Sequence, residues 1–149
     1  MKQEYYIYLA CGAILTLLFI VFREDLYNIF YYSTGFNDQL YNHGLYTTIP
    51  SIAVIVGWGT AAVYYYAINS VRFDRWWHWL VMLAVAAVLS PVLGLIANIS
   101  AFNEAGLDYG SDIVLFEFGN MVLTALLFVV ASFSMRWWSS NCRHTPFPQ

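Results

Sequence analysis

Apolar residues are concentrated in four long stretches of the chain, at residues 5–22, 49–68, 80–99 and 113–135. Each stretch has about the 20 residues that a helix needs to cross a bilayer core of roughly 30 Å. None of them shows the strict apolar–polar alternation of a strand in a membrane barrel. The pattern therefore predicts an all-α integral membrane protein with four transmembrane helices.

The segments between these stretches are polar, and the longest of them is the predicted outer loop at residues 23–48. Its first part has Leu26, Ile29, Phe30 and Ser33 at helical spacing, which predicts either an extension of the first helix or a helix along the membrane interface. The other connections are short enough to join neighbouring antiparallel helices. No small-residue cleavage pattern follows the first apolar stretch, so we expect that stretch to remain as a helix. We predict one four-helix transmembrane domain over residues 1–149, arranged as a bundle with short loops.

The composition supports a membrane protein. Hydrophobic residues make up 60% of the chain and charged residues only 10%, whereas about 25% of the residues in an ordinary soluble domain are charged. Membrane lipid is therefore the first partner that the sequence predicts.

The basic residues predict which way the chain faces. If the N-terminus is cytoplasmic, Arg23 is the only basic residue on the outer side. Short loops rich in Lys and Arg stay in the cytoplasm. We therefore expect an N-in/C-in protein of the bacterial inner (plasma) membrane, with both termini cytoplasmic. The basic residues on the cytoplasmic side would be Lys2, Arg72, Arg75, Arg136 and Arg143.

Tryptophans gather where two predicted spans meet the cytoplasmic boundary. The indole ring is apolar with one polar group, which suits the headgroup region of a bilayer. A stacking platform for nucleic-acid bases is the alternative, but both groups of tryptophans end a span, so we expect no nucleic acid. The predicted interface anchors are Trp76, Trp77, Trp79, Trp137 and Trp138.

Small residues recur every fourth position in the second and third stretches. Helices in lipid associate through close packing, which small side chains permit. We expect these two stripes to be helix-packing surfaces, either inside the bundle or against a partner protein. Their members are Ala53, Gly57 and Ala61 in the second stretch and Ala86, Ser90 and Gly94 in the third.

The fourth stretch carries a carboxyl group, Glu117, within an otherwise apolar run. Asn120 and Thr124 follow it at i+3 and i+7, so the three residues share one helical face. Asn98, in the third stretch, has about the same predicted depth. We predict an intramembrane polar cluster of these four residues. It is either a polar clamp between helices or a proton or cation site. We favour the clamp, because a second ionisable group deeper in the span would be expected along a conduction path.

The residue types that carry catalysis are sparse. His43, His78 and His144 fall outside the predicted spans, so no pair of histidines can hold a haem between helices. Cys11 and Cys142 are far apart in the sequence, and no C-x-x-C motif is present. No phosphate-binding or nucleophile motif occurs either. We predict no enzyme, no cofactor, no metal site and no soluble small-molecule substrate.

Three functions remain after these exclusions. The first, which we favour, is a non-catalytic, multi-pass subunit or scaffold of a larger cell-envelope membrane complex, such as a secretion or injection machine. The second is a small oligomeric ion channel or proton-coupled carrier that uses Glu117. The third is an inner-membrane immunity protein. Other membrane-protein subunits or further copies of the chain are the expected partners.

Overall fold

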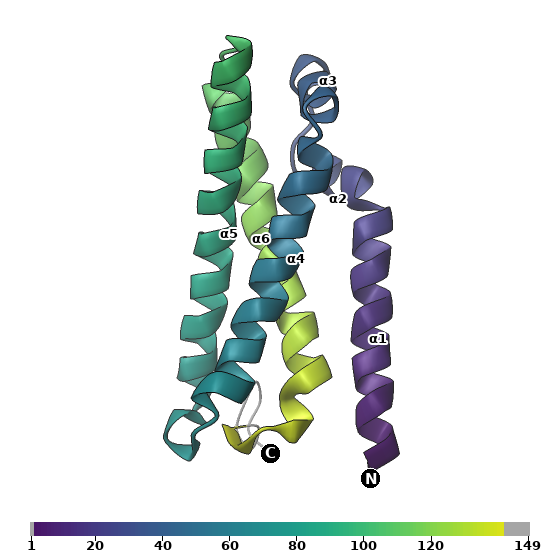
Figure 1. Ribbon diagram of the computed structural model, residues 1–149, viewed down its shortest axis with the longest axis vertical. Helices are drawn as coiled ribbons and strands as arrows, with labels where there is room; N and C mark the ends of the chain where they lie inside the picture. Colours follow the sequence, from purple (N-terminus) through teal and green to yellow (C-terminus); the bar gives the residue numbers. More distant parts are fainter. Residues whose placement is uncertain (1, 142–149) are drawn as a thin grey trace.

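The computed structural model describes residues 2–141 and contains four helices long and apolar enough to span a membrane (Figure 1). They are α1 (Lys2–Val21), α4 (Leu45–Ala62), α5 (Trp76–Ala105) and α6 (Gly110–Met135). A π-helix, η1 (Val63–Ile68), continues α4 without a break. Within the described residues the fold is entirely helical, as the sequence predicts.

Each of the four long helices begins before the apolar stretch that predicted it, and α5 extends furthest beyond its stretch. The third was expected at residues 80–99, but α5 begins at Trp76 and ends at Ala105. Gly106, with a φ of 68°, terminates α5, and its amide donates to the carbonyl of Asn103. Hydropathy detects only the apolar part of a helix, whereas backbone hydrogen bonding continues into the polar turns at each end.

The prediction of a loop at residues 23–48 is wrong for most of that segment. Residues 23–42 form two short helices, α2 (Arg23–Phe30) and α3 (Thr34–Asn42), and α4 already begins at Leu45. In α3, Phe36 and Leu40 lie one turn apart on the same face, and both are fully buried. The segment is amphipathic, and packing against the long helices keeps it helical despite its polar composition.

Helix α6 lies at the centre of the bundle. In its most apolar segment half of the residues are buried, compared with 17% of the residues in the corresponding segment of α1. It packs against α1, α2, α4 and α5, whereas α1 contacts the bundle chiefly through α6. Figure 1 shows α1 standing to one side of the other three long helices. Residues that determine how the bundle holds together are therefore expected on α6.

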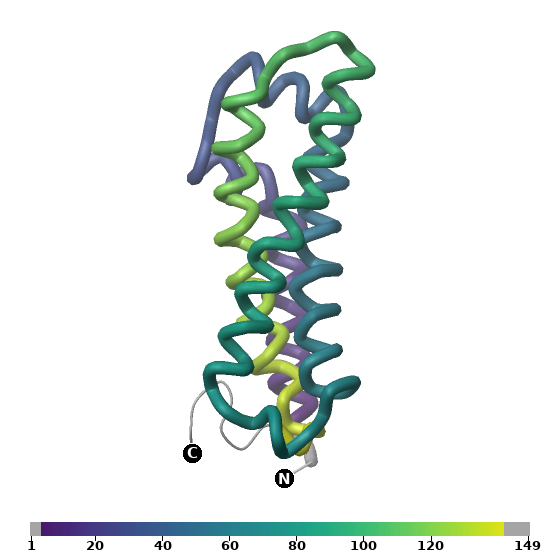
Figure 2. Tube along the Cα trace, turned by 90° about the vertical axis from the view of Figure 1, so that its left-hand side faces the viewer, coloured from purple at the N-terminus to yellow at the C-terminus, as the bar shows by residue number. Residues whose placement is uncertain are grey.

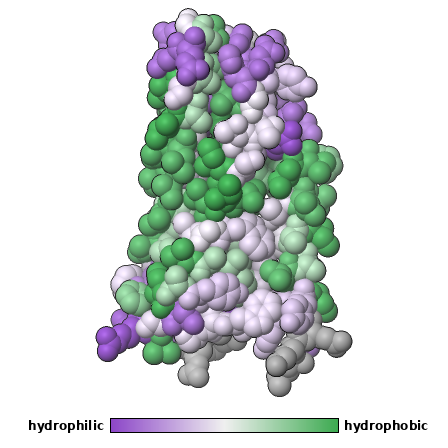
Figure 3. Space-filling model, in the orientation of Figure 1, coloured by the Kyte–Doolittle hydropathy of each residue, from purple (hydrophilic) through white to green (hydrophobic). Residues whose placement is uncertain are grey.

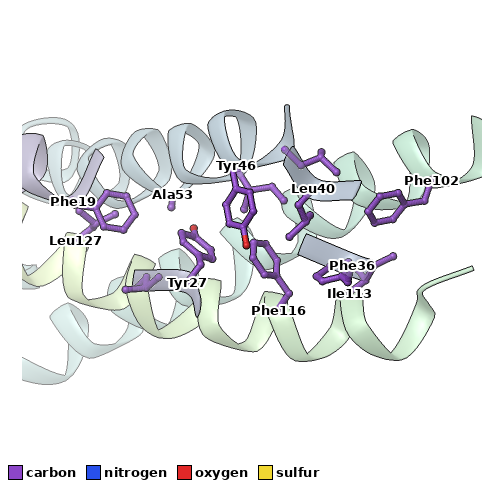
Figure 4. Close-up of a cluster of buried hydrophobic side chains, with 13 residues drawn as sticks. Phe19, Tyr27, Phe36, Leu40, Tyr46, Ala53, Phe102, Ile113, Phe116 and Leu127 are labelled. Carbon is purple, nitrogen blue, oxygen red and sulfur yellow. The ribbon is translucent and has the colours of Figure 1, made fainter. Parts of the chain in front are cut away.

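One hydrophobic core lies where α2 and α3 pack onto the long helices (Figure 4). Phe36 is packed edge-on against Phe102 and Phe116, with ring centroids 5.8 and 5.7 Å apart. The hydroxyl of Tyr31 donates to Asp112 in the first turn of α6, and this bond raises the pKa of Tyr31. The short helices thus close one end of the bundle.

The opposite end holds the first turn of α1, the connection from α4 to α5 and the end of α6 (Figures 1 and 2). Here Tyr66 donates to the carbonyl of Met135, and Asn141 donates to the carbonyl of Tyr64. Ser140 also bonds to Asn69, whose backbone is left-handed. These bonds tie the α4–α5 connection to the segment that follows α6.

Candidate functional site

The candidate site is a cluster of polar side chains between α5 and α6. Glu117, Asn120 and Thr124 lie on the buried face of α6, and Asn98 faces them from α5. Only 3% of Glu117 is exposed, and the other three side chains are fully buried. The structure therefore brings together all four residues of the polar cluster.

The carboxyl group of Glu117 accepts a hydrogen bond on each oxygen. Asn98 donates from Nδ2 to Oε1 across the helix interface at 2.8 Å. Asn120 donates from Nδ2 to Oε2 at 2.7 Å, within α6. Thr124 makes a longer contact of 3.5 Å with Oδ1 of Asn120. Glu117 is thus held by two amides, one of which belongs to the neighbouring helix.

A glycine makes room for the carboxyl group. A Cβ atom added at Gly94 would lie 2.3 Å from both carboxyl oxygens of Glu117, well inside van der Waals contact. Ser90, one turn earlier on the same face of α5, is fully buried. Two atoms of this face, Oγ of Ser90 and Oδ1 of Asn98, have no hydrogen-bond partner.

Tyr27 belongs to the cluster, although the sequence did not point to it. Its hydroxyl donates to Oδ1 of Asn120 at 2.7 Å, and its ring stacks on Phe116 at 4.8 Å between centroids. Tyr27 lies in α2, within the segment expected to be a loop. The helical spacing of apolar residues in α2 was a signal, but it does not indicate which long helix α2 packs against.

The small-residue stripes also lie inside the bundle. A Cβ atom at Gly57 would be 3.0 Å from Cβ of Leu127 and 3.2 Å from the backbone nitrogen of Phe128, so α4 and α6 are in close contact there. All six residues of the two stripes are buried: Ala53, Gly57, Ala61, Ala86, Ser90 and Gly94.

Two further close approaches were not predicted. A Cβ at Gly12 would meet Oγ of Ser134 at 1.8 Å, and one at Gly119 would meet Cβ of Phe30 at 2.7 Å. These glycines bring α1 and α2, respectively, against α6. Neither glycine belongs to one of the two stripes recognised in the sequence, so the spacing did not mark it as a contact.

The predicted tryptophan anchors occupy different environments. Trp76, Trp77 and Trp138 are exposed. Trp137 is half-buried and stacks on Tyr8, with centroids 4.9 Å apart.

Trp79 is not a surface anchor, which corrects that prediction. Its indole is buried and donates to Oγ of Ser132 on α6 at 3.0 Å. Trp77 and Trp79 are two residues apart and therefore point about 160° apart around the helix, so one faces outward while the other faces α6.

In residues 2–141, no three His, Cys, Asp or Glu side chains come together as a group that could hold a metal ion. Cys11 is exposed on α1. Three residues considered in the sequence analysis, Cys142, Arg143 and His144, lie outside the described residues.

No protein family, curated protein or solved structure matches this chain. The site therefore has to be interpreted from its own geometry.

Proposed function

We propose that this chain is a non-catalytic, multi-pass subunit or scaffold of a larger membrane complex in the cell envelope. The observation that carries the proposal is that the carboxyl group of Glu117 is hydrogen-bonded within the bundle. Both of its oxygens accept hydrogen bonds from side chains of the chain itself, and one of these bonds joins α5 to α6. In this arrangement the carboxyl group stabilises helix pairing.

The outward faces of the helices support a membrane location. Large apolar side chains such as Leu17 on α1 and Val88 and Ile96 on α5 are well exposed. A belt of apolar surface lies between the more polar ends of the molecule in the view of Figure 3. Surfaces of this kind fit lipid or the helices of a partner protein, whereas soluble monomers rarely expose such large apolar patches.

We infer an N-in/C-in orientation from the basic residues, with α2 and α3 on the outer side of the bacterial inner membrane. Reporter fusions test this directly. A reporter after Gln149 or near Asp74 should show a cytoplasmic location, and one inserted at Gly106 should show the opposite side. The φ of 68° and the open space around Gly106 make it a suitable insertion point. A cytoplasmic signal from Gly106 would overturn the orientation.

A small channel or proton-coupled carrier is the second candidate, because ionisable residues within spans often mark ion paths. The observation in its favour is Glu117 itself. Against it, four surface grooves of the described bundle are lined almost entirely by apolar side chains, and none of these four includes Glu117. The two functions make opposite predictions for one variant.

The deciding experiment combines native purification with a flux assay. A tagged chain extracted from native membranes should migrate on a native gel above the size of its own homo-oligomer, with a membrane partner at a fixed ratio. Glu117→Gln should retain the partner, Glu117→Leu should lose it, and Glu104→Leu, at an exposed position on α5, is the matched control. The opposite result is a chain that purifies without a partner and moves protons or cations into liposomes, with no flux in Glu117→Gln. That result would support the carrier and contradict the scaffold.

A further inference from the structure

The buried carboxyl group of Glu117 has no positive partner among the described residues. Its α5 neighbours are Gly94 and Asn98, and Asn120 accompanies it on α6. From α2, Tyr27 approaches the cluster through Asn120. All of these groups are uncharged.

Other titratable groups on the packed helices are directed elsewhere. On α6, Asp112 is bonded to Tyr31, and on α4, the hydroxyl of Tyr46 donates to Asn28. On α5, Glu104 is exposed. Helix α1 contributes Glu4 in its first turn, at the end away from α2, and Cys11, whose side chain is exposed. On α2, Arg23 donates to the carbonyl of Ile20. Among the side chains that the structure describes, no cation of these helices is paired with Glu117.

An ionised carboxylate in this position would be unpaired in a low-dielectric interior. Burying an unpaired charge costs far more than two neutral amide donors return, and the usual resolution is that the group becomes neutral. The surrounding lipid, which contains no water to solvate the charge, strengthens the argument.

The side chain of Asn98 can accept a hydrogen bond from a protonated Glu117. Oδ1 of Asn98 is buried and has no partner. A half-turn of the Asn98 amide about its Cβ–Cγ bond exchanges Oδ1 and Nδ2. The amide oxygen then lies about where Nδ2 is now, 2.8 Å from Oε1 of Glu117, which is the usual O–H···O distance of about 2.7–2.8 Å. A protonated Glu117 would donate to this oxygen, while its other oxygen still accepts from Asn120.

We propose that Glu117 and Asn98 form a proton-binding site, in which Glu117 is a neutral carboxylic acid that donates to Oδ1 of Asn98. The inference rests on the proposed clamp function and names the species that the clamp holds. The proton comes from water when the bundle forms, and it stays between α5 and α6.

Infrared spectroscopy of the purified chain in a lipid bilayer at neutral pH tests this proposal. We expect the carbonyl stretching band of a protonated carboxylic acid, shifted when the chain is produced with ¹³C-labelled glutamate. The band should disappear in Glu117→Gln and persist in Glu104→Gln, the matched control. In Asn98→Leu it should move to another frequency, because the hydrogen bond of the acid is lost.

The proposal is overturned if the wild-type chain shows no such band at neutral pH, or if the band survives in Glu117→Gln. The isotope shift in the wild-type chain provides a test even if a variant does not fold. The outcome is also independent of the scaffold function, because partner retention and the infrared band are separate measurements.

Discussion

Gly94→Ala should destabilise the bundle by about 1–3 kcal/mol, the usual range for adding volume to a packed interior. The new Cβ would stand 2.3 Å from both oxygens of Glu117. The carboxyl group lies at the end of a flexible side chain and can swing aside. Moving it, however, breaks the hydrogen bonds from Asn98 and Asn120 and leaves buried amides without acceptors. Unfolding in mixed detergent micelles, followed by circular dichroism, measures the loss.

Two controls separate this mechanism from a general effect of removing glycine. Gly59→Ala adds the same methyl group where no atom lies within 4 Å, so it should change stability little. In a Glu117→Ala background, Gly94→Ala should cost almost nothing, because the group that it displaces is absent. The double-mutant cycle should therefore give a coupling energy of about 1–3 kcal/mol, the full cost of Gly94→Ala in the wild-type chain. A coupling energy of zero would mean that Gly94 does not serve the carboxyl group.

Glu117→Leu should weaken the bundle by roughly 2 kcal/mol, because the buried amides of Asn98 and Asn120 lose the carboxyl group to which they bond. Hydrogen bonds between membrane helices average about 0.6 kcal/mol each, and the unpaired donors add to that loss. Glu117→Gln keeps a carbonyl oxygen for one amide and supplies an NH₂ group that can reach Oδ1 of Asn98. It should therefore cost less than about 1 kcal/mol. The same unfolding assay compares the two variants.

Asn98→Leu provides the matched change on α5, since it removes the hydrogen bond across the helix interface and leaves the Asn120 bond within α6. Its cost should fall between those of the two Glu117 variants. If Glu117→Leu is as stable as the wild-type chain, the carboxyl group does not hold the helices together, and a different role for Glu117 has to be sought.

The four long helices were readable from the sequence because each depends on a local property, an apolar run of sufficient length. The helical face that carries Glu117, Asn120 and Thr124 was readable for the same reason, since their spacing matches the helical period. The helical spacing of apolar residues indicated α2, although not as a separate helix, whereas α3 was missed. Their polar composition resembles that of a loop, and their helical state depends on the buried contacts of residues such as Phe36 and Leu40.

The sequence by itself determined the class of fold, the approximate spans and the presence of a carboxyl group within one of them. Its depth in the third stretch already made Asn98 a candidate partner of that group, and the structure places it across the interface. The tertiary structure alone decided the two remaining neighbours: Tyr27 by way of Asn120, and Gly94 as the space beside the carboxyl oxygens. It also turned Trp79 inward, onto Ser132. The physical reason is that hydropathy and periodicity describe one helix at a time, whereas partners are set by how helices rotate and approach one another.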